Sequence, residues 1–250
     1  MSVNDVSPAS STVDPAEIAR FSKLSEQWWD PKGKMAPLHR LNPLRLAYIR
    51  DAACRKFDRN PRSLGCLAGL RILDIGCGAG LLCEPLTRLG AQLIGVDASE
   101  TNIAVARMHA ERSHLSIDYR VGTAEDMDPR ERFDIVLAME VIEHVSSVPL
   151  FVDRCAALTK PSGFMLVSTL NRTWKSFALA IVGAEYVLRW LPRGTHQWDK
   201  FVTPDEILHH LTRNKLSVTD QIGVVYNPLA DRWKLSSDMD VNYMMIAEAL

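Results

Sequence analysis

Short apolar runs alternate with helical segments from residue 71 to residue 169, and this alternation restricts the possible folds more than any other feature of the chain. The strand-like runs lie at residues 71–75, 92–96, 117–121, 133–137 and 164–169. Helical stretches lie between them at residues 79–89, 100–112 and 149–158. Strands that alternate with helices form a parallel sheet with helices on both faces. The sequence therefore predicts an α/β fold with a doubly wound, Rossmann-like sheet.

The segment before this core is expected to be helical. Residues 1–13 are rich in Ser and Asp and are predicted to be a disordered tail. Residues 14–60 are predicted to form N-terminal helices, one over residues 15–29 and a second that starts near Pro43 and runs to residue 57. The whole of residues 14–250 is expected to be a single domain.

The segment after the core is expected to add one helix and two strands. Thr203 and Glu206 predict a capping box for a helix through residue 211. Apolar runs near residues 216–226 and 241–247 predict the last two strands. Consecutive strands without a crossover helix usually pair antiparallel, so the sheet should end in an antiparallel strand.

A glycine-rich loop joins the first strand to the first helix of the core. It reads DIGCGAG over residues 74–80, with Gly76, Gly78 and Gly80 at its turn. Glycines let the backbone approach a ligand closely, and a helix N-terminus supplies free N–H donors. Asp97 follows about 20 residues later at the end of the second strand, where an acid accepts hydrogen bonds from both hydroxyls of a ribose. This combination indicates a nucleoside cofactor.

The spacing of the loop favours one kind of nucleoside cofactor. A dinucleotide fingerprint needs the pattern GxGxxG, whereas this loop reads GxGxG and continues with Leu81. Asp74, two residues before the first glycine, would repel a pyrophosphate but suits a ligand that carries an ammonium and a sulfonium. An NAD-dependent dehydrogenase is therefore disfavoured, and S-adenosylmethionine is the expected cofactor. A glycine-rich turn with no ligand remains the alternative for any one of these residues taken alone.

This pattern resembles the class I S-adenosylmethionine-dependent methyltransferases. The resemblance implies that Gly76 lines the methionine part of the cofactor and that Asp97 binds its ribose. Gly78 is also expected to bind the cofactor. It also implies that the adenine lies near residues 122–126. Many members of that family carry an acid where this chain has Thr123, so Glu125 or Asp126 is expected to supply that contact instead.

Further segments are similar to one subfamily, the ubiquinone-biosynthesis O-methyltransferases, over nearly the whole chain from about residue 14. These segments are WWD at 28–30, PLHRLNPLR at 37–45, MEVIEHV at 139–145, STLNR at 168–172, VGAEY at 182–186, RGTH at 193–196 and DVNYM at 240–244. The resemblance implies methylation of the hydroxyls of 2-polyprenyl-6-hydroxyphenol and 3-demethylubiquinol. It also implies that Arg45 contacts the cofactor, where a guanidinium can hold the methionine carboxylate, and that Met139 walls the cofactor pocket.

Glu140, Glu143 and His144 follow the fourth strand, and their residue types allow two roles. His144 can take the phenolic proton as a general base, because an imidazole titrates near neutrality, with Glu143 as its catalytic neighbour. Alternatively, the two carboxylates and the imidazole can bind Mg²⁺, the role that matching residues have in the eukaryotic branch of the resembling family. A solely structural role for His144 is the third possibility.

Residues 172–202 form an insertion after the fifth strand. It mixes large apolar side chains with several basic ones and is too charged to span a bilayer, so it predicts an amphipathic helix that lies on a membrane surface or covers the substrate as a lid. The net charge of −1 gives no reason to expect a nucleic-acid partner. Five cysteines without a CxxC pair argue against a disulfide framework. The expected location is the cytoplasm, with peripheral binding to the inner membrane.

Two alternatives to a polyprenyl-phenol methyltransferase stay open at this point. One is a methyltransferase that acts on a soluble phenolic acceptor. The other is a cofactor-binding subunit without catalytic activity, held in a complex of quinone-biosynthesis proteins.

Overall fold

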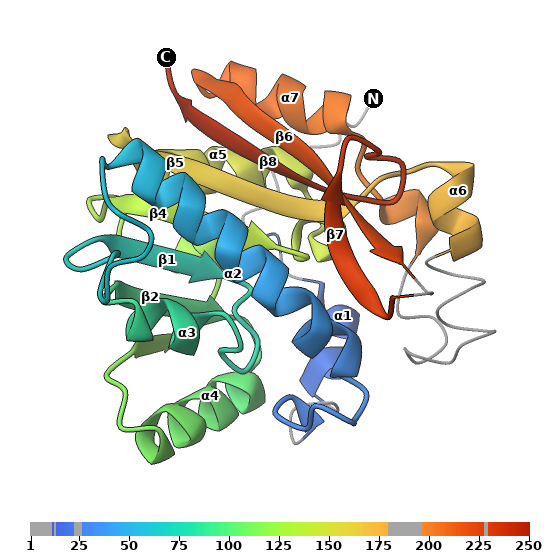
Figure 1. The fold of residues 1–250 in the computed structure, drawn as a ribbon. Helices are drawn as coiled ribbons and strands as arrows, with labels where there is room; N and C mark the ends of the chain where they lie inside the picture. Colours follow the sequence, from blue (N-terminus) through green and yellow to red (C-terminus); the bar gives the residue numbers. More distant parts are fainter. Residues whose placement is uncertain (1–11, 13, 23–26, 180–196, 228–229) are drawn as a thin grey trace, which may run out of the picture.

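A mixed β-sheet is the centre of the fold in the computed structural model (Figure 1), which describes residues 12, 14–22, 27–179, 197–227 and 230–250. The predicted disordered tail at residues 1–13 lies outside the described residues except for Thr12. Within the described residues, eight strands form one sheet in the order β3-β2-β1-β4-β5-β8-β6-β7.

The parallel half of the sheet contains the five strands predicted from the alternating pattern. They are β1 (Arg71–Ile75), β2 (Gln92–Asp97), β3 (Asp118–Val121), β4 (Phe133–Met139) and β5 (Thr159–Leu170). The Rossmann-like prediction is thus confirmed. One boundary was wrong, because β5 begins at Thr159 and not after a turn at residues 161–163. The pairing of β5 with β4 shifts between Phe133 and Ile135, and this bulge absorbs the proline and glycine expected to form a turn.

The other half of the sheet is antiparallel. β8 (Asn242–Ala249) lies between β5 and β6 (Leu216–Asn227) and pairs antiparallel with both, which confirms the predicted antiparallel ending. β7 (Arg232–Ser236), which pairs with β6 at the edge of the sheet, was not predicted from the sequence. Its short run of alternating Arg, Trp, Lys and Leu carries too little apolar signal to be read as a strand.

Helices cover both faces of the sheet (Figure 1). One face carries α2 (Ala36–Lys56), α3 (Cys83–Arg88) and α4 (Glu100–Arg112), and the other carries α5 (Val148–Leu158) and α7 (Pro204–Arg213). Alternate residues of each central strand point into opposite cores, as the pleat requires. In β4, for example, Leu137 belongs to the core under α2, whereas Val136 belongs to the core under α5.

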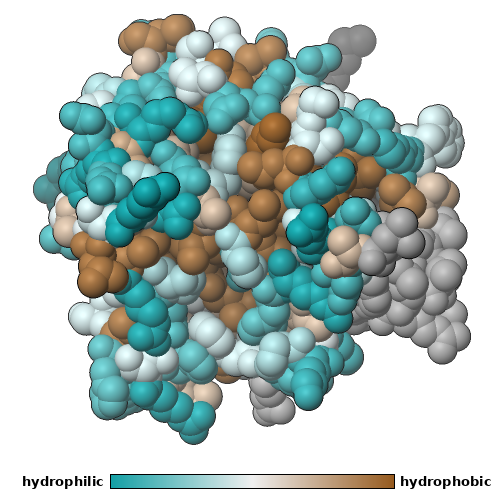
Figure 2. Space-filling model, in the orientation of Figure 1, coloured by the Kyte–Doolittle hydropathy of each residue, from teal (hydrophilic) through white to brown (hydrophobic). Residues whose placement is uncertain are grey.

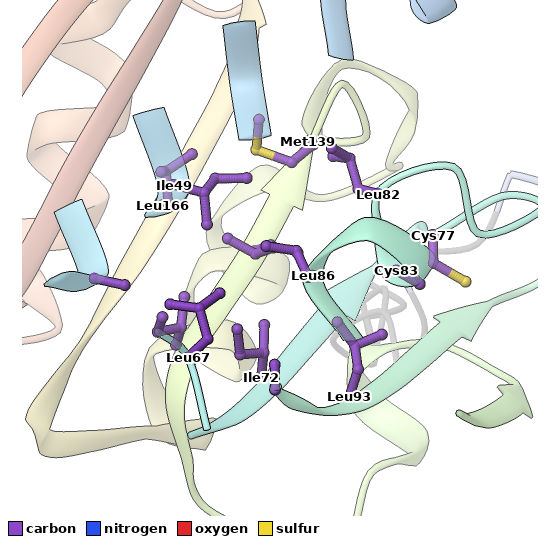
Figure 3. Packing of buried hydrophobic residues seen from close by; sticks show 14 of the residues in the cluster. Ile49, Leu67, Ile72, Cys77, Leu82, Cys83, Leu86, Leu93, Met139 and Leu166 are labelled. Carbon is purple, nitrogen blue, oxygen red and sulfur yellow. The ribbon is translucent and has the colours of Figure 1, made fainter. Parts of the chain in front are cut away.

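Figure 3 shows the core that joins α2 and α3 to the sheet. Ile49 of α2, Leu86 of α3 and Ile72 of β1 are fully buried there, and Met139 at the end of β4 lies beside Leu82. The burial of these apolar side chains fixes α2 across the face of the sheet. The helix therefore holds its polar residues at a constant distance from the ends of the strands.

The N-terminal helices differ from the prediction in their bounds. α1 is described over Pro15–Ser22 and does not reach residue 29, where the chain forms turns. α2 begins at Ala36, seven residues before the predicted start at Pro43. Pro37 lies in the first turn of α2, where no N–H is required, and Pro43 lies inside the helix at a cost that the buried apolar face offsets. The predicted caps are confirmed, because Ser99 caps α4 and Thr203 forms a capping box with Glu206 at α7.

Gly223 in the middle of β6 allows a loop to cross the sheet closely. A Cβ atom at this position would lie 1.7 Å from the backbone oxygen of Asp238, in the segment that connects β7 to β8. The backbone of Gly223 cannot move freely, because it pairs with both Tyr243 and Ser236. The close approach places Asp238 at the rim of the large cavity described below.

We expect Gly223→Ala to lower the free energy of unfolding by about 1–3 kcal/mol, because the methyl group forces the backbone of Asp238 away from β6. Gln221→Ala, an exposed position on the same strand, should change it by less than about 0.5 kcal/mol. Urea denaturation of both variants measures the difference. Equal stabilities would show that the Asp238 segment moves away without cost.

Candidate functional site

A cavity of about 720 Å³ opens at the carboxyl ends of β1, β2 and β4. This is the edge at which open α/β sheets bind their ligands. α2 lies along one side of the cavity, and the β6–β7 hairpin closes it at the end away from the glycine loop. Its size suits a nucleoside cofactor together with part of an acceptor.

The glycine loop forms the floor of one end of this cavity. Gly76 and Gly78 adopt φ values of 73° and 56°, a conformation that glycine takes without strain. A Cβ atom at Gly76 would lie 2.6 Å from the side chain of Val141, and one at Gly78 would lie 2.4 Å from the ring of Trp28. Only glycine therefore fits at either position.

Asp97 is held rigidly at the end of β2. Its Oδ2 accepts a hydrogen bond from the N–H of Gly78 at 2.9 Å, which ties it to the glycine loop. Its Oδ1 accepts from the N–H of Ser99 at 2.9 Å and from the amide of Asn102 at 3.2 Å. Burial raises the pKa of Asp97, and these hydrogen bonds oppose the rise. The carboxylate lines the cavity in a fixed orientation, as ribose binding requires.

Asp74 is buried at the same end of the cavity. Its burial, with a further contribution from the charge of Asp97, raises its pKa to about 7. The Cys83 thiol donates a hydrogen bond to Asp74 at 3.3 Å, and the charge of Arg45 opposes the rise. A cationic ligand in the cavity would favour the ionised form of this carboxyl group.

Two of the residues that line this end of the cavity contain a buried polar atom without a hydrogen-bond partner among the described residues. Among the described residues, Nε1 of Trp28 and Oδ1 of Asn102 are both buried and have no hydrogen-bond partner. An unpaired buried donor or acceptor is costly, so a ligand with polar groups is a good occupant. The residues present therefore fit a nucleoside cofactor with a positive charge, as S-adenosylmethionine is.

Arg45 reaches the cavity from the middle of α2, where it is only 3% exposed. Its guanidinium pairs with the carboxylate of Glu140, with Nη2 2.7 Å from Oε1. Glu140 also accepts hydrogen bonds from the amide of Asn242 at 3.0 and 3.1 Å and from the hydroxyl of Ser168. The buried Arg45 and the half-buried Glu140 therefore form an ion pair at the junction of β4, β5 and β8.

The backbone at Glu140 explains why the three polar residues after β4 separate. Glu140 has φ 54°, a left-handed conformation that is uncommon for a residue with a side chain. A single 3-10 turn, η3 (Ile142–His144), follows it. The helical turn that would have placed Glu140 and Glu143 on one face does not form, and the two carboxyl groups take different partners.

Glu143 is 3% exposed and accepts a hydrogen bond from the hydroxyl of Thr169 at 2.7 Å. Burial raises the pKa of Glu143, and the neighbouring charge of Glu140 raises it further. Its side chain lines the cavity, so it remains a candidate for proton transfer.

His144 lies at the rim of the cavity beside α1. Its Nδ1 is 3.2 Å from a carboxylate oxygen of Glu17, which is itself buried. Lys200, in the 3-10 turn η5 (Trp198–Lys200), lies 3.4 Å from the other oxygen of Glu17 and 3.0 Å from Asp14. Glu17 could not be identified from the sequence, because one acid in an ordinary amphipathic helix has no distinctive spacing.

The magnesium site predicted from Glu140, Glu143 and His144 does not assemble. Each of the three residues has its own protein partner, namely Arg45, Thr169 and Glu17. Among the described residues, no group of three or more His, Cys, Asp or Glu side chains is arranged to hold a metal ion. The donor set therefore does not fit Mg²⁺, which requires several oxygen ligands in a near-octahedral array.

Of two further residues predicted to bind the cofactor, Met139 lines the cavity and Glu125 does not. Met139 is buried at the end of β4 and lines the cavity (Figure 3). Glu125 lies in the 3-10 turn η2 (Ala124–Asp126), and its Oε1 accepts a hydrogen bond from the N–H of Thr12 at 3.1 Å. It is not among the described residues that line the cavity, where Thr123 and Ala124 are found instead. Asp126, the alternative, bonds to Thr123 as a cap and is exposed.

The insertion at residues 172–202 is described only at its two ends. α6 (Trp174–Ser176) begins it, and residues 180–196, with two segments that carry the family resemblance, lie outside the described residues. Trp174, Phe177 and Trp198 form an aromatic cluster with ring centroids 5.3–6.3 Å apart. Figure 2 shows hydrophobic surface in the middle of the face drawn in Figure 1 and extending toward the side on which α6 lies. Within the described part of the chain, no helix has the length and apolar character needed to cross a bilayer.

Comparison with known proteins places this site in a family. The sequence profile of a methyltransferase domain matches residues 73–167. A ubiquinone biosynthesis O-methyltransferase from Rhodopseudomonas palustris (strain BisB18) is 74% identical over 99% of this chain and 98% of its own length. The enzyme of the same name from Nitrobacter winogradskyi is 76% identical over 96% of this chain and 92% of its own.

Solved structures support the fold. Magnesium protoporphyrin IX methyltransferase from Synechocystis PCC 6803, with bound S-adenosylhomocysteine, superposes with a TM-score of 0.67 at 16% identity, over 93% of this chain and 95% of that one. An S-adenosylmethionine-dependent methyltransferase from Clostridium acetobutylicum gives a TM-score of 0.62 at 11% identity, over 92% and 99%. With full-length identities near 75%, the chain belongs to the ubiquinone biosynthesis O-methyltransferases and is an S-adenosylmethionine-dependent enzyme.

Proposed function

We propose that this protein methylates the ring hydroxyls of 2-polyprenyl-6-hydroxyphenol and 3-demethylubiquinol. The observation that carries the proposal is the single continuous cavity, which joins the polar end at Asp74 and Asp97 to an apolar end. The apolar end is formed by residues from α2, β5 and the β6–β7 hairpin, among them Leu41, Leu170 and Trp233. It suits the ring and the first part of a prenyl chain, and the names of the relatives support the same substrate class.

In this proposal the cofactor occupies the end of the cavity formed by the glycine loop. Asp97 accepts hydrogen bonds from the ribose hydroxyls, and Asp74 attracts the positive charge. Gly76 and Gly78 let the backbone approach the methionine part, Met139 packs against the cofactor, and Arg45 holds its carboxylate. When bound, S-adenosylmethionine supplies a methyl group on a sulfonium that departs as a neutral thioether.

The chain's own residues then have one chemical task, the removal of the phenolic proton. A phenol has an ordinary pKa of about 10 and is a poor nucleophile while protonated. We assign the proton to the imidazole of His144, whose Nδ1 lies beside the Glu17 carboxylate. The negative charge of Glu17 stabilises the imidazolium formed. The oxygen electron pair attacks the methyl carbon in line, and the rigid cavity supplies the remaining rate through positioning.

Methyl transfer to short-chain versions of both acceptors tests this function. We expect both to be methylated, and we expect chelator to leave the rates unchanged, because the donor set does not fit Mg²⁺. His144→Asn should lower kcat at least about 100-fold with little change in cofactor affinity. Glu143→Gln keeps the contact with Thr169 and should lower kcat by less than tenfold.

Two results would contradict this scheme. A large loss of kcat in Glu143→Gln with a mild loss in His144→Asn would make Glu143 the base. Methylation of soluble catechols alone would replace the polyprenyl acceptor with a soluble phenolic one.

The pKa of Asp74 makes a separate prediction about cofactor binding. Without ligand, the Asp74 carboxyl group is largely protonated at pH 6, because its pKa is about 7. A bound cation favours the carboxylate, so binding at pH 6 releases a proton and the affinity should rise from pH 6 to pH 7.5. Calorimetry in two buffers of different ionisation enthalpy measures the release. Asp74→Asn should abolish both effects, and a variant with an unchanged pH dependence would exclude Asp74 as their source.

We also propose that the protein binds the inner membrane as a peripheral protein through residues 172–202. In the described part of this segment, Trp174 is 77% exposed and Leu179 is 55% exposed, and Leu179 lines the cavity. The basic side chains there are engaged internally, since Arg172 pairs with Glu206 and Lys175 with Asp238. Apolar insertion is therefore the stronger source of membrane affinity in this part.

Flotation with phosphatidylglycerol vesicles tests the membrane proposal. We expect the double variant Trp174→Ser, Leu179→Ser to float about tenfold less than the unmodified protein, because two exposed apolar side chains no longer insert. Leu64→Ser with Leu208→Ser, two exposed apolar positions elsewhere, is the matched control and should float normally. Equal flotation of both double variants would overturn the assignment.

A further inference from the structure

Trp28 lies between the N-terminal helices, outside the sheet, yet its indole forms part of the cofactor end of the cavity. The side chain is 8% exposed and lines the cavity. Its ring contacts Gly78 so closely that a Cβ atom there would lie 2.4 Å from Cη2. Gly78 in turn donates its N–H to Asp97. The indole is therefore next to the two groups expected to hold the methionine and ribose parts of the cofactor.

Neighbouring contacts hold the backbone of Trp28 and the side chain of Trp29 in place. The Nε2–H of His39 in α2 donates to the carbonyl oxygen of Trp28 at 2.8 Å. The adjacent Trp29 donates its Nε1–H to the carbonyl oxygen of Ala79 at 3.1 Å. Its ring also stacks on His109 of α4, with centroids 3.4 Å apart and planes within 2°. This segment is thus fixed to α2, to the glycine loop and to α4.

His109, on which Trp29 stacks, is held by a carboxylate of α3. Nδ1 of His109 is 2.6 Å from Oε1 of Glu84, a carboxylate of α3 that is 3% exposed. α2 therefore holds the backbone of Trp28, and α3 and α4 together orient the ring of Trp29. Such a built arrangement is what positions a side chain toward a ligand.

The indole N–H of Trp28 is buried and has no hydrogen-bond partner among the described residues. A buried donor without an acceptor is unfavourable, and a ligand that supplies an acceptor removes this penalty. Indole N–H groups in buried sites usually find such a partner.

We infer that Trp28 closes the cofactor compartment and donates its Nε1–H to an oxygen of bound S-adenosylmethionine or S-adenosylhomocysteine. The inference rests on the proposed position of the cofactor beside Asp97 and Gly78. Trp28 becomes a cofactor-binding residue, and Trp29 a positioning residue that acts through it. The first helices of the chain are then part of the cofactor site and not only a cover for the acceptor.

Binding of S-adenosylhomocysteine, measured by calorimetry, tests the inference without any turnover. Trp28→Phe keeps an aromatic ring but removes the donor, so the dissociation constant should rise about 3- to 10-fold. The increase in Tm caused by the ligand should shrink accordingly. The matched control is Trp233→Phe at the acceptor end of the same cavity, which should leave the dissociation constant within twofold of the unmodified protein.

The unmodified protein offers a second measurement that does not depend on a variant folding. With ¹⁵N-labelled indoles, the N–H resonance of one of the six tryptophans should move downfield when S-adenosylhomocysteine saturates the protein, and this resonance should be absent in Trp28→Phe. The inference fails if no indole resonance moves in this way, or if Trp28→Phe and Trp233→Phe weaken binding equally. Asp97→Asn tests the proposed position of the cofactor separately from the role of Trp28. If it weakens binding and Trp28→Phe does not, the proposed cofactor site stands and only the role of Trp28 falls. If neither does, the cofactor lies elsewhere.

Discussion

Carboxyl groups crowded at one edge of a parallel sheet are the constraint on which this site depends. The topology ends β1, β2 and β4 side by side, and these ends carry Asp74, Asp97 and Glu140. Burial raises the pKa of Asp74 and Asp97, because removing a charge from water is costly. Arg45 is the buried cation among the described residues that line the cavity, and it neutralises Glu140. The remaining excess of acid favours a positively charged ligand, so charge as well as shape selects the cofactor.

The parts of the site that the sequence could predict are those fixed by local rules. Gly76 and Gly78 need left-handed backbone, and Asp97 ends a strand at a set distance from them, so their arrangement follows from spacing alone. Ser99 and Thr203 cap the helices that follow them for the same local reason. The parallel, doubly wound character of the sheet also followed, because its strands alternate with helices along the chain.

The parts that could not be predicted depend on contacts between distant segments. Glu140 has φ 54° and its carboxylate bonds to Ser168 and Asn242, so three residues that look like one cluster in the sequence take different partners. Glu17 meets His144 across more than a hundred residues, with no pattern in either segment to indicate it. β7 carries so few apolar residues that only its pairing with β6 identifies it as a strand. Each of these features was decided by tertiary structure, and each affects the chemistry assigned to the site.

The place of β8 in the sheet has a consequence for how the molecule is made. β8 follows every other strand in the chain, yet it lies inside the sheet between β5 and β6 and supplies Asn242 to the Arg45–Glu140 pair. A ribosome therefore releases α2, with Arg45, long before the last strand that completes its surroundings. Until then β6 has no partner on its inner side, and the edge of β5 is open to pairing with other chains. Protection of that edge during synthesis is a requirement that this topology places on the cell.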